Sequence, residues 1–359
     1  MLSAITQRRL ANLRKNKRGY YSLWIFGILF GCSLCAELVI NSQPLLVSYE
    51  GEFYYPIIKK YSEKTFGGDF ETETDYLDPY IQEKINSAGW ILFPPVRYYY
   101  DTIITNLNTP APSPPSQQNW LGTDDQARDV FARVVYGFRL STVFGLALTI
   151  ISMVIGVSAG GIQGYFGGWI DLFFQRFIEV WESIPTLYLL IILSSVIIPS
   201  FAWFLLLLSL FSWIGYTGVV RAEFLRIRNL DYVRSAKAMG LSHITIMFRH
   251  VLPNAMIATI TFLPFNLAAA ITTLAALDFL GFGLPPPTPS LGEMIYQGKN
   301  NLSAPWLGLT GFFVLAIMLS LLMFAGEAIR DAFDYQKTFK SSKPDDSSTE
   351  SSASSVVKS

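Results

Sequence analysis

Charged residues are scarce in this chain. They make up 15% of its 359 residues, against about 25% in an ordinary soluble protein, while 51% are hydrophobic. The 27 Lys and Arg residues balance the 27 Asp and Glu residues, so the chain lacks the basic excess that draws proteins to nucleic acid. The two cysteines and two histidines argue against a disulfide framework, an iron–sulfur cluster or a structural zinc site. This composition is typical of a membrane protein.

Five runs without any charged side chain mark the predicted membrane spans. They cover residues 19–36, 141–170, 183–220, 251–277 and 300–326. A helix needs about 20 apolar residues to cross a bilayer, so the third run is too long for one crossing. Pro199 and Ser200 lie near its middle and predict a break. The sequence therefore predicts six spans. A cleaved signal peptide is the alternative for the first run, which is longer than the signal core of about 7–15 residues.

In the tails and short loops, Lys and Arg residues gather in three segments: the N-terminal tail, the loop after the fourth span and the C-terminal tail. Such cations collect on the cytoplasmic side of a membrane. With six spans all three segments lie on the same side, so both termini are predicted to be cytoplasmic. The opposite side has only Lys299 in its short loops, and the segment 41–140 is too long for this rule to apply. The cations are Arg8, Arg9, Arg14, Lys15, Lys17 and Arg18, then Arg221, Arg226, Arg228, Arg234, Lys237 and Arg249, then Arg330, Lys337, Lys340 and Lys343.

The spans divide the chain into an all-α core and three other parts. The predicted segments are a cytoplasmic tail 1–19, a first spanning helix 20–40, an outer insert 41–140, a five-helix core 141–330 with a cytoplasmic loop 221–250, and a disordered Ser-rich tail 331–359. The proline-rich stretch 109–116 predicts a stiff, extended linker inside the insert. The fold of the insert cannot be predicted from its sequence.

Glycines recur every fourth residue on the second predicted span, at Gly156, Gly160 and Gly164. Small residues at this spacing leave a smooth stripe on a membrane helix, against which another helix can approach closely. We therefore expect these glycines to serve helix packing.

The loop after the fourth span predicts a compact knob of two short helices. Asp231 is a suitable N-cap and Gly240 a suitable stop for the first helix, whose apolar face carries Val233 and Ala236. Ser242 can cap a second helix through Phe248, and Pro253 suits the opening turn of the fifth span. A basic and apolar knob of this kind suits docking into a groove of a partner protein. The alternative is an amphipathic loop lying on anionic lipid.

The spacing in this loop resembles the signature of ABC importer permeases, usually written E-A-A, three residues, G, nine residues, I-x-L-P. Ser235 and Ala236 fall on the two alanine positions and Gly240 on the glycine. Arg234 stands in place of the usual Glu, and His250 in place of the Ile. The resemblance implies that the loop couples the permease to an ATPase, through Asp231, Tyr232, Val233, Arg234, Ser235, Ala236, Lys237, Ala238, Met239, Gly240, His250, Leu252 and Pro253.

Further segments are similar to the C-type permeases of dipeptide and oligopeptide importers. These segments are residues 121–133, 136–141, 164–171 and 277–284. A His-x-Leu-Pro ending, here 250–253, is familiar in the same branch. The long insert resembles that of the Yej-type permeases, peptide importers that also admit the antibiotic microcin C.

The resemblance implies a six-helix permease of the type I ABC importer fold in a bacterial inner membrane. It would pair with a second permease, two cytoplasmic ATPase domains and a periplasmic peptide-binding protein. ATP and Mg would bind the ATPase partner, and this chain would bind no cofactor and catalyse no reaction. The stretch from Gly292 to Lys299 lacks the spacing and the Ser or Thr of a phosphate-binding loop.

An ion-coupled secondary transporter or a channel with six spans remains the alternative function. Coupled transporters usually carry ionisable groups near the middle of the bilayer. The polar residues inside the predicted spans are uncharged Ser, Thr and Asn residues, which argues against such a mechanism. A membrane-embedded enzyme would need a nucleophile beside a base, and both histidines, His243 and His250, lie in the loop.

Overall fold

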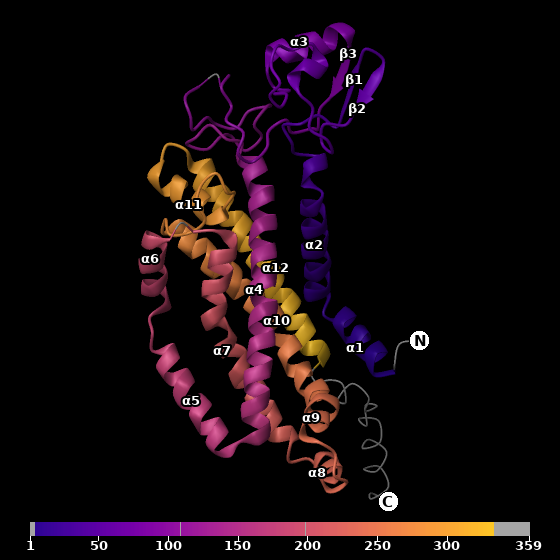
Figure 1. Cartoon of the computed structure of the whole chain (residues 1–359), viewed down its shortest axis with the longest axis vertical. Helices are drawn as coiled ribbons and strands as arrows, with labels where there is room; N and C mark the ends of the chain where they lie inside the picture. Colours follow the sequence, from indigo (N-terminus) through magenta and orange to yellow (C-terminus); the bar gives the residue numbers. More distant parts are fainter. Residues whose placement is uncertain (1–3, 108, 198, 334–359) are drawn as a thin grey trace, which may run out of the picture.

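The chain forms a bundle of long helices with a small insert at one end (Figure 1). This computed structural model describes residues 4–107, 109–197 and 199–333. We call the end that carries residues 41–129 the insert end and the opposite end the loop end. The helices of the bundle are α1 (Ala4–Lys15), α2 (Lys17–Leu34), α4 (Val130–Phe166), α5 (Gly168–Glu182), α6 (Thr186–Val196), α7 (Phe201–Ile227), α10 (Leu252–Phe279), α11 (Leu291–Asn300) and α12 (Pro305–Phe333).

Four helical stretches of the described residues are each long and apolar enough to cross a membrane: α4, α7, His243–Phe279 and α12. A fifth candidate is the pair formed by α5 and the first part of α6, which bend by 58° at their break. The predicted break at Pro199 and Ser200 is present, because α6 ends at Val196 and α7 begins at Phe201, where Ser200 caps it. The predicted first span corresponds to α2, which starts with two cations, Lys17 and Arg18, and its crossing stays a prediction.

The helices extend beyond the uncharged runs of the sequence. Helix α4 begins at Val130, well before the predicted start at residue 141, and α7 continues to Ile227 past the predicted end at residue 220. The extra turns carry charged residues, such as Arg133 on α4 and Arg221 on α7, and therefore lie outside the uncharged runs. The insert therefore ends as a unit near residue 129, and the first part of the predicted loop 221–250 belongs to α7.

Glycines allow α4 and α7 to approach closely. A Cβ atom on Gly156 would lie 2.5 Å from the Cβ of Tyr216, and one on Gly160 would lie 2.6 Å from the carbonyl oxygen of Thr217. A Cβ atom on Gly164 would lie 2.5 Å from the Cβ of Phe224. The glycine stripe of the second predicted span therefore lies directly against α7.

This close packing predicts the effect of adding a single methyl group. Gly160→Ala should destabilise the protein by about 1–3 kcal/mol, because the new Cβ meets backbone that cannot rotate away. The measurement is the melting temperature of the purified protein in detergent. Gly218→Ala on α7 is the control, because no atom lies within 4 Å of its Cβ position. Equal melting temperatures of the two variants would contradict the prediction.

The insert contains a small sheet covered by a helix. Strands β1 (Leu46–Tyr49), β2 (Glu52–Tyr54) and β3 (Gly89–Leu92) form an antiparallel sheet in the order β2-β1-β3. Helix α3 (Pro79–Ala88) and the short helix η2 (Glu63–Phe66) pack against one face. Phe66 is fully buried there among edge-to-face tyrosine rings. The short helix η1 (Ala36–Leu38) joins α2 to the insert.

The proline-rich stretch 109–116 does not stand free as a spacer. The Ser113 amide donates to Thr123 Oγ1 at 2.8 Å, and the Thr123 amide donates to the Ser113 carbonyl at 2.9 Å. Trp306 of α12 donates its indole N–H to the Thr123 carbonyl at 3.2 Å. The stretch is therefore held against the segment that leads into α4.

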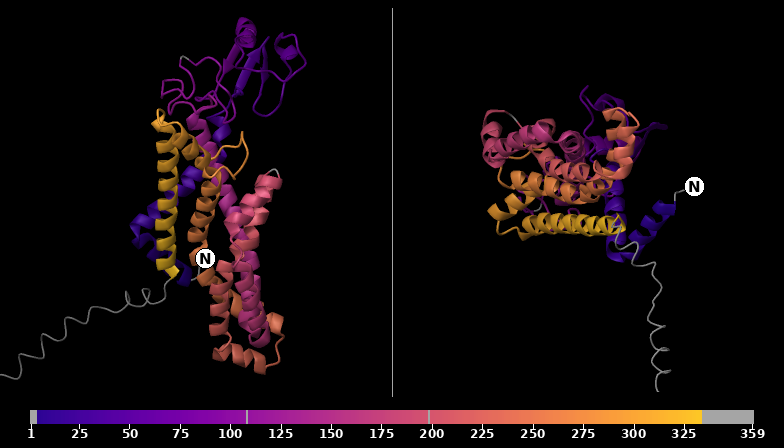
Figure 2. Two further views of the ribbon diagram at one scale, coloured as in Figure 1. Left: turned by 90° about the vertical axis from the view of Figure 1, so that its left-hand side faces the viewer. Right: turned by 90° about the horizontal axis from the view of Figure 1, so that it is seen from below.

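Both described ends of the chain lie toward the loop end, away from the insert (Figure 1). The predicted N-terminal tail contains helix α1, which projects sideways from the bundle next to the end of α12 (Figure 2). The guanidinium of Arg9 lies over the ring of Phe333 at 4.6 Å and joins these helices. The tail 331–359 is predicted to be disordered, but its first three residues, 331–333, belong to the end of α12. Residues 334–359 lie outside the described ranges.

Candidate functional site

Helix α8 (Asp231–Ala238) is the first helix of the predicted knob. The expectation that Asp231 is its N-cap is wrong: Leu230 occupies that position, and its carbonyl accepts the amides of Val233 and Arg234 at 3.0 and 3.1 Å. Asp231 is instead the first helical residue, where its negative charge interacts favourably with the positive end of the helix dipole. Gly240 ends the helix as predicted, in a left-handed conformation with φ of 79°. The Leu241 amide reaches back to the Ala236 carbonyl at 3.3 Å.

The second helix of the knob is continuous with the long helix that follows. Ser242 caps α9 (His243–Ile246) through the Thr245 amide, as predicted. The expected separate start of the next span at Pro253 is wrong, because a π-turn (Met247–Val251) joins α9 directly to α10. Proline offers no amide to the carbonyl four residues before it and would clash with that carbonyl. The wider turn relieves this conflict, with the Leu252 amide bonded to the Met247 carbonyl.

The apolar face of α8 is buried in the knob as predicted. Val233 and Ala236 are both 1% exposed or less, and they pack with Phe224, Ile227 and Ile246. These partners come from the end of α7 and from α9. The knob is therefore one packed unit with its neighbouring helices and can move with them as a rigid body.

Polar contacts tie the knob to the end of α4. Arg228 donates from Nη1 to the carbonyls of Gly164 and Tyr165 at 3.0 and 3.2 Å. These carbonyls lie in the last turn of α4, where carbonyls lack hydrogen-bond partners within the helix. The Tyr165 hydroxyl lies 2.9 Å from His243 Nδ1, and Lys237 Nζ lies 5.1 Å from the centre of the Tyr165 ring. These contacts join residues more than 60 positions apart, so no local pattern in the sequence predicts them.

The outward face of the knob is apolar with a basic rim. Met239, Ile244 and Phe248 are 73%, 70% and 65% exposed, respectively. Arg234, Ser235 and Ala238 are also exposed, and no ion pair involving Arg234 occurs within the described ranges. We call Met239, Ile244 and Phe248 the knob face. Ile244 and Phe248 also line a hollow of about 410 Å³ beside Ile162 and Phe166 of α4. Exposed large apolar side chains are a feature of protein interaction sites.

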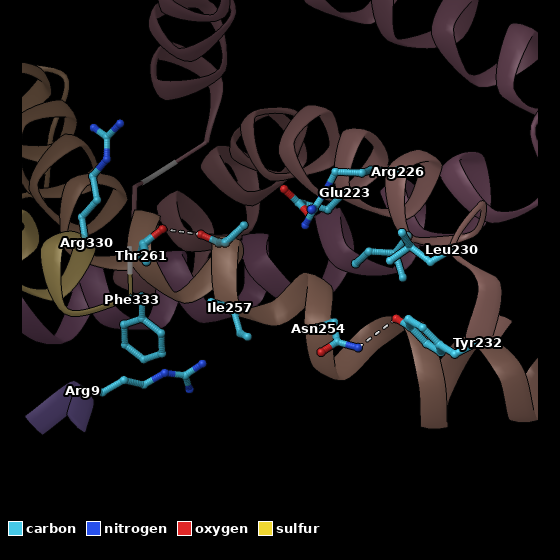
Figure 3. A pocket seen from close by; sticks show the side chains of 12 residues that line it. Arg9, Glu223, Arg226, Leu230, Tyr232, Asn254, Ile257, Thr261, Arg330 and Phe333 are labelled. Carbon is cyan, nitrogen blue, oxygen red and sulfur yellow. Dashed lines mark hydrogen bonds and ion pairs between the residues drawn. The ribbon is translucent and has the colours of Figure 1, made fainter. Parts of the chain in front are cut away.

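A cavity of about 690 Å³ lies beside the knob, between α1, α7, α10 and α12. On its knob side Asn254 donates to the Tyr232 hydroxyl at 3.0 Å, a contact drawn as a dashed line in Figure 3. Asn254 also donates to the His250 carbonyl at 3.1 Å, within the π-turn. These bonds connect α8 to the first turn of α10. They place Tyr232 and His250, two predicted loop residues, at the junction between the knob and a spanning helix.

A buried charge cluster lies at the insert end. Arg128 and Arg133 are each 1% exposed, as is Asp124. Arg133 Nη2 lies 2.5 Å from Glu293 Oε2, and Arg128 Nε donates to Asp124 Oδ2 at 2.7 Å. Arg133 Nε also lies 3.4 Å from Asp124 Oδ2. The cluster joins the start of α4 to α11. In the sequence, Asp124, Arg128 and Arg133 stand out only because the segment 121–133 resembles peptide permeases.

Asp129 fixes the start of α4 next to this cluster. Its carboxylate accepts the Ala132 amide and the Asn119 side chain, each at 2.8 Å. Burial raises the pKa of Asp129 above its ordinary value, while the hydrogen bonds from Asn119 and the backbone act in the opposite direction. This N-cap was not predicted, because the helix was expected to start later.

Comparison with known proteins shows the family. Residues 132–337, more than half of the chain, match the family described as "Binding-protein-dependent transport system inner membrane component". The chain therefore belongs to this family and is a multi-pass protein of the inner membrane.

Curated relatives agree with this assignment. The "Inner membrane ABC transporter permease protein YejE" of Escherichia coli (strain K12) is 57% identical over 94% of this chain and 98% of its own length. The "Peptidoglycan transport system permease protein YejE" of Agrobacterium fabrum is 55% identical over 94% of this chain and 95% of its own length. The "Dipeptide transport system permease protein DppC" of Haemophilus influenzae is 37% identical over 60% of this chain and 73% of its own length.

Proposed function

We propose that this protein is the permease subunit of an ATP-driven importer that carries peptides into the cell. The high identity to two YejE permeases over nearly the whole chain carries this conclusion. The dipeptide and oligopeptide permeases among its relatives indicate the substrate class. We include peptide antibiotics such as microcin C among the possible cargo, on the resemblance of the long insert to that of Yej-type permeases.

The partners proposed for this chain are a second permease, two ATPase domains and a periplasmic peptide-binding protein. The knob supports an ATPase partner, because it lies at the loop end of the bundle (Figure 1) and its knob face consists of three exposed large apolar side chains. ATP and Mg would bind to that partner. The cations near α1 and the knob favour a cytoplasmic loop end, which puts both termini in the cytoplasm and the insert in the periplasm.

The continuous helix from His243 to Phe279 supports a direct mechanical coupling. ATP binding would favour one of two conformations of the ATPase pair, and the knob would transmit that preference to the spans. Because α9 passes into α10 through a π-turn without a flexible break, a displacement of the knob also displaces α10. The Arg228 bonds pass the same displacement to the end of α4.

Transport in reconstituted vesicles tests the proposed function. The complex that co-purifies with this chain is placed in vesicles with its peptide-binding protein, and uptake of a labelled tripeptide is followed. We expect uptake to require ATP on the side of the loop end and to survive a protonophore. Uptake that collapses with the proton gradient but survives removal of ATP would overturn the proposal in favour of an ion-coupled transporter.

The knob face gives a separate prediction about assembly. Phe248→Asp should reduce the amount of ATPase that co-purifies with this chain at least several-fold, because a charge would enter an apolar contact. Phe70→Asp in the insert is the control, since Phe70 is also 65% exposed and lies at the opposite end. If the two variants retain equal amounts of ATPase, the knob face is not the docking surface.

A further inference from the structure

A small polar pocket lies in the middle of the helix bundle. Its volume is about 190 Å³, and it is lined by α4, α7 and α10. The polar residues that line it are Thr149, Ser152, Ser212, Tyr216, Asn266 and Thr273. Each of the three helices contributes residues from near its middle. The pocket therefore lies near the middle of these helices and has no charged residue in its lining.

Three hydroxyls at this pocket are buried without a hydrogen-bond partner among the described residues. They are Thr149 Oγ1, Ser152 Oγ and the Tyr216 hydroxyl, on residues that are 2%, 1% and 2% exposed. Two other hydroxyls on α4 each bond to a carbonyl of the preceding turn. Thr142 donates to the Phe138 carbonyl and Ser158 to the Val154 carbonyl, each at 2.8 Å. Thr149 and Ser152 depart from this local pattern at the pocket.

A second group of polar side chains completes the lining. Ser212 and Thr273 bond to carbonyls of their own helices at 2.8 and 2.9 Å. Asn266 donates its amide N–H to the Phe262 carbonyl at 3.1 Å, which leaves its side-chain oxygen as an acceptor. The Asn266 side chain is the polar group that interacts with the Tyr216 hydroxyl, although the two do not have the geometry of a hydrogen bond. The pocket thus offers both donors and acceptors to a ligand.

We propose that this pocket binds a peptide group of the substrate as it crosses the membrane. The proposal rests on the proposed function and names an intramembrane site for the same cargo. A peptide group carries one N–H donor and one C=O acceptor, which match hydroxyls that can serve in both roles. Keeping a buried polar group unpaired is unfavourable, and three of the nine such groups in the described residues line this one pocket, which favours a polar ligand there.

The size and neutrality of the pocket define which part of the peptide it takes. A volume of 190 Å³ is below the range of about 300–1,000 Å³ typical of pockets that enclose a whole ligand. The site therefore takes one segment of a longer chain. Ala269 and Thr273 are exposed on α10, so the pocket opens onto the surface of the subunit. Because the lining is uncharged and would bind the peptide backbone, which all peptides share, the pocket can accept peptides of different sequence.

The test removes the three hydroxyls and compares two substrates. The variant combines Thr149→Val, Ser152→Ala and Tyr216→Phe, and the control combines Thr142→Val and Ser158→Ala, whose hydroxyls already bond to carbonyls. Reconstituted complexes import trialanine or an analogue whose central amide is N-methylated. We expect trialanine uptake to fall about three- to tenfold in the variant, with a smaller fall for the analogue. The binding protein is the same in all complexes, so its preference for one peptide cancels when the uptake of each peptide by the variant is divided by its uptake by the wild type.

Two further results separate the possible failures. Unchanged uptake of trialanine by the triple variant would overturn this proposal and leave the proposed function intact. Failure of the wild-type complex to import either peptide with ATP would overturn the proposed function. Replacing unpaired hydroxyls should not lower the melting temperature. If the triple variant does not assemble, Ser152→Ala alone decides: unchanged trialanine uptake by this single variant overturns the proposal.

Discussion

Gly240→Pro should abolish peptide-stimulated ATP hydrolysis and peptide uptake while the spans remain inserted. Gly240 has a φ of 79°, whereas proline is held near −65°, so the turn between α8 and α9 cannot form. The substitution also removes the amide that bonds to the Lys237 carbonyl at 3.0 Å. The measurement is ATP hydrolysis by the reconstituted complex with and without peptide. Residual hydrolysis is expected to become independent of peptide.

A matched glycine at the opposite end of α10 provides the control for this variant. Gly281 also has a φ of 79°, and its amide bonds to the Asp278 carbonyl at 3.1 Å. Gly281→Pro imposes the same backbone strain at the insert end and should retain the normal amount of co-purified ATPase. Peptide-stimulated hydrolysis at the wild-type level in Gly240→Pro would show that the knob does not couple ATPase and permease.

The long apolar helices could be predicted because a local run of about 20 apolar residues is enough to indicate each one. The ends of α4 and α7 could not, since these helices continue through charged turns beyond the uncharged runs. The sheet of the insert was also not predictable. Its outer strands pair on either side of β1, and β3 lies about 40 positions further along the chain. Such pairing depends on contacts that no local pattern records.

The knob was predicted in outline, but its connection to the next span was not. The end of α8 at Gly240 and the start of α9 at Ser242 were predicted correctly, because a left-handed glycine and a capping serine each act on the adjacent helical turn alone. Pro253 was read as a helix start, whereas the chain keeps the helix continuous by widening one turn. The contacts of Arg228 with the end of α4 arise only when distant segments meet. The same holds for the unpaired hydroxyls of the central pocket.

Arg133→Met should destabilise the protein by about 3–5 kcal/mol, because it removes one partner from a buried charge cluster. Glu293 would lose its 2.5 Å ion pair, and the carbonyls of Pro287 and Thr288 would lose donors at 3.3 and 3.4 Å. These acceptors lie at and before α11, so we expect α11 to separate from the start of α4 first. The measurements are the melting temperature in detergent and amide hydrogen exchange across α11.

An exposed ion pair of the same type sets the scale for this effect. Arg176 pairs with Glu179 on α5, but their side chains are 70% and 56% exposed, so Arg176→Met should cost at most about 1 kcal/mol. Adding Glu293→Gln to Arg133→Met should recover part of the loss, because it removes a carboxylate that has lost its nearer cation and keeps only Arg128, at 3.4 Å. If Arg133→Met melts at the same temperature as Arg176→Met, the cluster does not hold α11 to α4, and the helix must be held by its apolar contacts alone.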